Sequence, residues 1–150
     1  MQTFLPYQSF VHSAAALDNK RLGKQRVEAM QILRVLSGET QAWRNHPAVR
    51  MWSGFEHSLR AYFNIISFTW KCRGFQHNMG FFKDFEVEYP PWLTEEFCRS
   101  HQSNLIRKDP HYYRPIFGAD IPPDLPYIWP EAVISITAIN QIGVKPTTPK

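Results

Sequence analysis

The segment from Leu17 to Gly38, LDNKRLGKQRVEAMQILRVLSG, constrains the fold most, because it combines an apolar stripe with a basic cluster. The apolar side chains that recur at roughly helical spacing are Val27, Met30, Ile32, Leu33 and Leu36. The basic side chains of its first half are Lys20, Arg21, Lys24 and Arg26. We therefore expect an amphipathic helix over about residues 18–37, with Asp18 as its cap, whose charged face is turned from the core toward an anion.

Two further stretches have helical character. The apolar pattern that opens at residue 46 runs to Gly74 and is too broad for a surface helix, so we expect one central helix there. Thr94 is followed by two glutamates, a combination typical of a helix start, and its helix is expected to reach about residue 107. A short helical turn is expected to begin at Ser9 or Ser13.

The rest of the chain is expected to lack regular structure. Pro6 favours an extended N-terminal segment packed on the domain, and the aromatic and proline-rich residues after Asp109 favour an irregular segment over the helices. Residues 133–139 alternate apolar and hydroxyl side chains, which favours an edge strand. The predicted fold is mostly α, a compact single domain at residues 1–130 with about three main helices, followed by an extension of unknown role at residues 131–150.

Composition limits the location and the partners. The formal charge of +4 is modest, so the clustering of the basic residues matters more than their total. Cys72 and Cys98 lack the paired spacing of a zinc site, and the chain opens without a secretory signal pattern. We therefore expect free thiols and a cytoplasmic, nucleoid-associated protein. No apolar run approaches about 20 residues, so no membrane role is expected.

Two more clusters favour nucleic acid. The cluster at the start of the second helical pattern is Arg44, Asn45, His46 and Arg50. The cluster at the end of the third is His101, Asn104, Arg107, Lys108, Tyr112 and Tyr113. Helix starts attract phosphate, and basic residues interleaved with aromatic ones suit backbone contact with base stacking. Solvated charges and core tyrosines remain the structural alternative, but three clusters together favour a nucleic acid as partner.

No known hydrolase, phosphate-loop or metal-ligand motif is present in the sequence, so neither a metal nor a cofactor is expected. From the residues alone, His46 and His101 are more readily explained as structural or phosphate-contacting groups than as general acids or bases. Because the sequence shows no partner for its carboxylate, Asp18 is likewise better explained as a helix cap than as a catalyst.

The motifs resemble the pyrimidine dimer DNA glycosylase family, of endonuclease V type, over about residues 1–117. The matching segments are MQTFLPY at the start, KRLGKQRV in the first helix, WRNHPAVRMW, KCRGF, and RKDPHYYRPIFG after the third helix. The resemblance implies a compact helical fold whose N-terminus lies against the first long helix, over the minor groove of kinked double-stranded DNA. A monomer is expected. The resemblance also implies a flipped nucleotide and an N-terminal amine that attacks C1′, assisted by a carboxylate, with β-elimination from the Schiff base.

The resemblance assigns roles to individual residues. Lys20, Lys24 and Arg26 match the DNA-contacting positions of the first helix, and Arg107 and Lys108 fall near those of the third. Apart from the resemblance, we also expect Gln2 to contact DNA. The nucleophile would be the amine of Met1, which is expected to be retained before the bulky Gln2, or a desolvated Lys20 or Lys24. The carboxylate position matches Arg21, so the nearest acidic candidates are Asp18 and Glu28, with His46 as a further catalytic candidate.

The leading hypothesis is a DNA glycosylase with AP-lyase activity, acting on a damaged or modified pyrimidine. Arg21 in the carboxylate position motivates one alternative, a DNA-binding protein without catalysis on the same scaffold. A second alternative is an enzyme for a modified pyrimidine nucleotide, in which the cationic pocket holds one phosphate. The salt dependence of duplex binding separates this second alternative from the other two hypotheses, because a nucleotide enzyme need not make several phosphate contacts.

Overall fold

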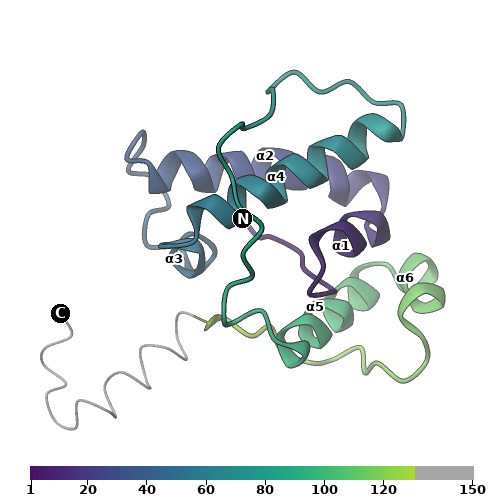
Figure 1. The fold of residues 1–150 in the computed structure, drawn as a ribbon. Coiled ribbons are helices and arrows are strands. Elements are labelled where there is room, and N and C mark those ends of the chain that lie inside the picture. The colour runs from purple at the N-terminus through teal and green to yellow at the C-terminus, as the bar shows by residue number, and fades with distance from the viewer. Residues whose placement is uncertain (131–150) are drawn as a thin grey trace, which may run out of the picture.

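The computed structural model describes residues 1–130, and the helices it contains there confirm the mostly α prediction (Figure 1). They are α1 (Phe10–Ala16), α2 (Asn19–Leu36), α3 (Pro47–Trp52), α4 (Glu56–Cys72), α5 (Glu95–Lys108) and α6 (Pro110–Phe117). Residues 1–130 contain no strand. The strand predicted at residues 133–139 lies outside the described residues.

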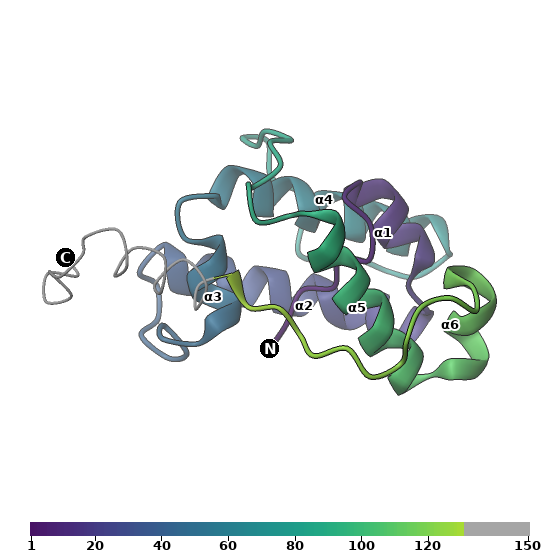
Figure 2. The ribbon, with the colours of Figure 1, turned by 90° about the horizontal axis from the view of Figure 1, so that it is seen from below.

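Helices α2 and α4 are the long pair of the fold and lie side by side in both views (Figures 1 and 2). Gly23, in the N-terminal part of α2, allows this approach. A Cβ atom added there would lie 2.7 Å from the Trp70 ring of α4. Glycine costs about 1 kcal/mol relative to alanine inside a helix, and here the close packing of the indole offsets that cost.

The prediction of one continuous helix over residues 46–74 is wrong. Gly54 has φ +89°, a left-handed conformation that favours glycine, and it separates α3 from α4. The Phe55 N–H donates to the carbonyl of Trp52 across this turn at 2.8 Å. The break turns α3 away from α4 while its buried face stays in the same core.

The prediction of an irregular segment after Asp109 is also wrong for residues 110–117, which form α6. The Asp109 carboxylate accepts a hydrogen bond from the Tyr112 N–H at 3.2 Å, and Pro110 occupies the first turn, where its missing N–H has no consequence. Proline and an acidic cap therefore start a helix here, although the same residues also favour turns. Residues 118–130 continue without regular structure.

The N-terminal segment is extended, as predicted, and is held by side chains of other helices. The bonds are Trp52 Nε1–H to Thr3 Oγ1 (3.0 Å), Phe4 N–H to Gln25 Oε1 (2.8 Å), Tyr62 O–H to the Phe4 carbonyl (2.8 Å) and Leu5 N–H to His101 Nδ1 (3.0 Å). Because α2, α3, α4 and α5 each contribute to them, the first residues of the chain have a fixed position.

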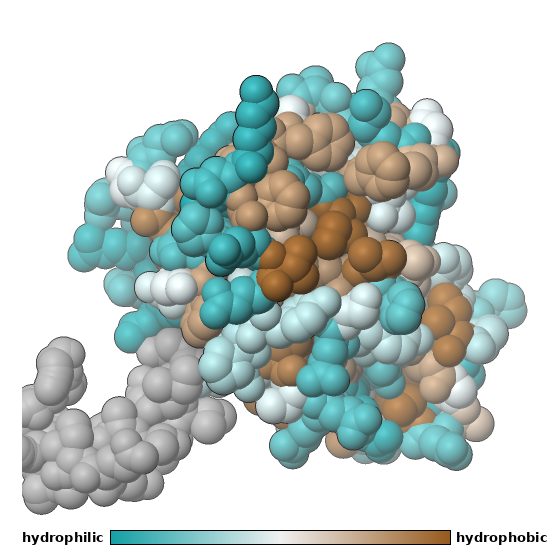
Figure 3. All heavy atoms as spheres, in the orientation of Figure 1, coloured by the Kyte–Doolittle hydropathy of each residue, from teal (hydrophilic) through white to brown (hydrophobic). Residues whose placement is uncertain are grey.

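The two sides of the molecule differ in character. Figure 2 shows the N-terminus on the side away from α4. Figure 3, drawn from the α4 side, shows apolar side chains gathered in the middle of that face, where Val11, Phe68, Phe81 and Phe85 border a shallow cavity. None of the helices within residues 1–130 has the length and apolarity to cross a membrane.

Candidate active site

The amine of Met1 lies beside a carboxylate. Its nitrogen is 3.9 Å from Glu28 Oε2, and both side chains are largely buried. Glu28 projects from the middle of α2, and the extended N-terminal segment carries Met1 to it. Both border a cavity of about 310 Å³, called the amine pocket from here on, whose basic lining residues are Lys20, Arg21, Lys24 and Lys108.

Gln25 fixes the geometry of the amine pocket. Its amide oxygen accepts hydrogen bonds from the Phe4 N–H at 2.8 Å and from the Tyr62 hydroxyl at 2.5 Å. Its amide nitrogen donates to the Gln2 carbonyl at 2.9 Å and to Glu28 Oε1 at 3.3 Å. One side chain therefore orients both the backbone next to the amine and the carboxylate that faces it.

The sequence analysis did not single out Gln25. The one available signal is its position on the helix, because Gln25 occupies the same buried side of α2 as Leu22 and Ala29. A polar side chain in such a position needs hydrogen-bond partners. The partners lie elsewhere in the chain, so the sequence alone does not identify them.

Asp18 and Arg21 bind each other rather than the amine. Arg21 Nη1 donates to Asp18 Oδ1 at 3.1 Å, and the Tyr113 hydroxyl also donates to this carboxylate. Burial by itself would raise the pKa of Asp18, but these two partners outweigh it and the pKa is lowered. Asp18 occupies the N-cap position as predicted, yet its side chain makes no capping hydrogen bond.

His46 lies in the electrostatic field of the amine pocket. It begins α3, where its Nδ1 accepts a hydrogen bond from the Ala48 N–H at 3.0 Å. Burial lowers the pKa of His46, the positive charge of the Met1 amine lowers it further, and Glu28 acts in the opposite direction. The ring therefore favours the neutral form, and proton transfer by it would use Nε2.

The predicted basic residues separate into different groups. Lys20, Lys24 and Lys108 are exposed at the amine pocket. Arg26 instead lies over the Trp70 ring, 4.8 Å from its centroid, and its Nη1 is 2.9 Å from His77 Nδ1. The prediction that Arg26 shares one face with the lysines is therefore wrong, because its position on α2 directs it toward α4.

The second and third clusters also divide between surface and core. Arg44, Asn45 and Arg50 are exposed, as are Arg107 and Tyr112. Arg107 Nη1 donates to the carbonyl of Pro123 at 2.5 Å.

His101, Asn104 and Tyr113 are buried, so their predicted contact with DNA does not fit the structure. His101 accepts a hydrogen bond from the N–H of Leu5, and burial lowers its pKa to about 3. His101 faces the core because the N-terminal segment covers α5 on that side, whereas Tyr113 belongs to α6 and donates its hydroxyl to Asp18.

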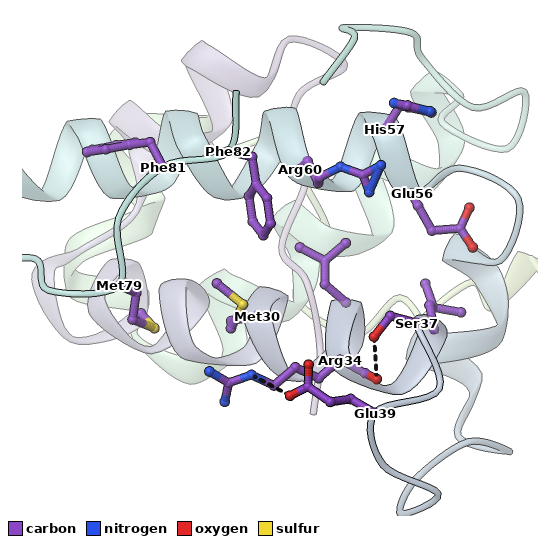
Figure 4. A pocket seen from close by; sticks show the side chains of 12 residues that line it. Met30, Arg34, Ser37, Glu39, Glu56, His57, Arg60, Met79, Phe81 and Phe82 are labelled. Carbon is purple, nitrogen blue, oxygen red and sulfur yellow. Dashed lines mark hydrogen bonds and ion pairs between the residues drawn. The ribbon is translucent and has the colours of Figure 1, made fainter. Parts of the chain in front are cut away.

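A larger cavity, of about 640 Å³, lies between α2 and α4, away from the amine (Figure 4). Figure 4 shows Met30, Met79 and Phe82 at this cavity, with the charged Arg34, Glu39 and Arg60 around them. It brings no amine and carboxylate together in the way the amine pocket does. Within residues 1–130, no three His, Cys, Asp or Glu side chains form a group that could hold a metal ion.

One comparison with known proteins matches the part of the chain that carries the amine and its carboxylate. A family model described as pyrimidine dimer DNA glycosylase matches residues 1–83, more than half of the 150 residues. This match includes Met1, Gln25 and Glu28. Comparisons with curated proteins and with solved structures give no match.

Proposed function

The chain belongs to the pyrimidine dimer DNA glycosylase family, and we propose that it excises a damaged or modified pyrimidine from duplex DNA and cleaves the resulting abasic site. The observation that carries the proposal is the Met1 amine 3.9 Å from Glu28 in a pocket bordered by lysines. An amine nucleophile with a neighbouring base is the arrangement that covalent catalysis at C1′ requires.

The proposed reaction begins with the transfer of a proton from the Met1 ammonium to Glu28, which frees the nitrogen lone pair. The amine attacks C1′, a C–N bond forms, and the glycosidic bond breaks with its electron pair leaving on the base. The departing base takes a proton from the newly bonded nitrogen, and the sugar ring opens as O4′ takes the proton held by Glu28, which leaves a protonated Schiff base. Glu28 then accepts a proton from C2′, the C3′–O bond breaks with its electron pair on the departing 3′ phosphate, and water hydrolyses the Schiff base to release the enzyme.

The surroundings of the amine suit a DNA substrate. Lys20, Lys24 and Lys108 are exposed around the amine pocket, where they can neutralise phosphates on either side of the target nucleotide. Gln2 lines the same pocket next to Met1. Arg21 motivated the alternative of a DNA-binding protein without catalysis, but Glu28, two helical turns further along the same side of α2, has its carboxylate beside the amine.

Trapping with borohydride tests the proposal. Wild-type protein incubated with an abasic duplex and borohydride should give a covalent protein–DNA adduct, because reduction of the Schiff base makes it permanent. Nα-acetylated protein should give none, and Glu28→Gln should form the adduct at least about tenfold more slowly, in line with typical losses of a general base. Glu39→Gln, an exposed carboxylate paired with Arg34, is the matched control and should react like wild type.

Two results would contradict the proposal. One is an adduct that forms equally well after the N-terminal amine is blocked, which would assign the chemistry to a lysine. The other is the absence of both adduct and base release over a panel of duplexes with damaged pyrimidines.

A further inference from the structure

Trp43 combines two features that a tryptophan rarely shows together. It has φ +65° and is the one non-glycine residue with positive φ within residues 1–130. Its side chain is also 61% exposed. A bulky residue in the left-handed region is strained, and such strain persists where the surrounding structure imposes it, often at binding sites.

The loop between α2 and α3 imposes this conformation through short-range hydrogen bonds. The Ala42 N–H donates to Thr40 Oγ1 at 3.2 Å, and the His46 N–H donates to the Trp43 carbonyl at 2.9 Å. Arg44 Nη1 donates to Gln41 Oε1 at 2.7 Å. The loop therefore presents the indole to solvent, although tryptophan is a residue that folding normally buries.

The indole packs against His46. Its ring meets the His46 ring edge to face, with 5.8 Å between centroids, and the Trp129 ring packs against the same imidazole at 6.2 Å. His46 in turn interacts electrostatically with the Met1 amine and Glu28. Figure 2 shows this loop and the N-terminus on the same side of the molecule.

We propose that Trp43 binds the target by stacking its indole on the pyrimidine that leaves the duplex, while the lysines of the amine pocket hold the phosphates. This inference rests on the proposed function and adds a residue that recognises the base. A flat, exposed ring suits a nucleobase, since every base has a face on which an aromatic side chain stacks. The exposed Arg44 next to it adds positive charge for the DNA backbone.

Two duplexes of identical sequence test this inference, one with an unpaired thymine and one with tetrahydrofuran, which lacks a base, at the same position. Fluorescence anisotropy gives the dissociation constant of each. Wild type should prefer the thymine duplex. Trp43→Ala should bind that duplex roughly 5- to 100-fold more weakly, the range expected for a lost base stack, and bind tetrahydrofuran within about twofold of wild type.

Three variants complete the experiment. Trp43→Gly suits the left-handed backbone, so it keeps the loop and removes the indole, and it should behave like Trp43→Ala. Trp43→Phe should retain most of the preference for thymine. Phe68→Ala, which removes a 62% exposed aromatic side chain of α4, should change neither affinity.

Equal losses on both duplexes would overturn the inference, because Trp43 would then support the loop or the backbone contacts. Unchanged affinities in Trp43→Ala and Trp43→Gly, or no preference of wild type for the thymine duplex, would overturn it as well. These affinities do not depend on catalysis. If wild type formed no borohydride adduct, the proposed function would fail. A thymine preference that wild type shows and Trp43→Ala loses would still report a base contact by Trp43.

Discussion

Gln25 illustrates at the scale of one residue how the chain builds the amine pocket. Its amide connects the Gln2 and Phe4 backbone to Glu28, so the nucleophile and the carboxylate share one support. The sequence allowed Met1 and Glu28 to be named as catalytic candidates, yet the carboxylate position was matched to Arg21. Local sequence cannot decide between these residues, because the contact depends on where the N-terminal segment crosses α2.

Replacing Gln25 by leucine should reduce both stability and adduct formation. The Phe4 N–H and the Gln2 carbonyl would lose their partners in a buried position, at a cost of about 2–4 kcal/mol. Urea unfolding measures the stability, and the rate of borohydride trapping measures the activity. Gln31→Leu, on the exposed side of the same helix, is the control and should change neither by much. Normal trapping by Gln25→Leu would show that the amide does not position the amine.

His101 makes the stability dependent on pH. Burial lowers the pKa of His101 to about 3 in the folded protein, whereas an unfolded histidine has a pKa near 6.5. Below about 6.5 the unfolded state therefore binds a proton that the folded state does not. The contribution of this histidine is complete above that pH and falls as the pH decreases toward 3.

Urea unfolding at pH 7 and pH 5 measures this dependence. The wild type should lose about 2 kcal/mol over the interval, since one group changes the free energy of unfolding by about 1.4 kcal/mol per pH unit. His101→Asn keeps an acceptor for the Leu5 N–H and should show a smaller loss. His111→Asn, at an exposed position, should match the wild type. Equal pH dependence in His101→Asn and wild type would contradict the assignment.

At the scale of elements, helix positions follow from the sequence where periodicity and caps agree. The first long helix was expected at about residues 18–37 and is found at Asn19–Leu36, and the third begins after its cap, Thr94. The errors occur at Gly54 and Pro110. A glycine inside an apolar pattern can lie within a helix or break it, and a proline after aspartate can lie in a turn or start a helix. Tertiary packing decides between these possibilities.

Gly23→Ala tests the contact between α2 and α4. Alanine would favour the helix by about 1 kcal/mol, but its methyl group would meet the Trp70 ring at 2.7 Å, and such overpacking typically costs about 1–3 kcal/mol. We expect a lower melting temperature in thermal unfolding. The same substitution in a Trp70→Phe background should cost less, because the smaller ring leaves room. A melting temperature above that of wild type would contradict the close packing.

For the whole molecule, the N-terminus and the apolar face lie on different sides (Figures 2 and 3), and lysines line the pocket at the N-terminus. The clustering of basic residues predicted an anionic partner, but not which of the basic side chains face it. Three lysines border the amine pocket, while Arg26, next to them in sequence, packs on Trp70. The periodicity of α2 alone does not decide which of its basic side chains face the pocket and which pack on α4. The tertiary structure decides it.

The salt dependence of duplex binding tests whether the three lysines, and not Arg26, contact the DNA backbone. Neutralising Lys20, Lys24 or Lys108 with glutamine should weaken binding and reduce the slope of log K against log salt by about 1 each, since each lysine would release one counterion. Arg26→Gln is the matched control on α2 and should leave the slope unchanged while lowering stability. A slope reduction for Arg26→Gln equal to that of the lysines would contradict the orientation of α2.

The identity of the atom that reacts tests the central claim most directly. After borohydride reduction with an abasic duplex, nuclease and trypsin digestion followed by mass spectrometry locates the sugar remnant on the protein. The account predicts the remnant on the α-nitrogen of Met1, in the peptide that begins MQTFLPY. A remnant on the ε-nitrogen of Lys20, Lys24 or Lys108 instead would contradict it.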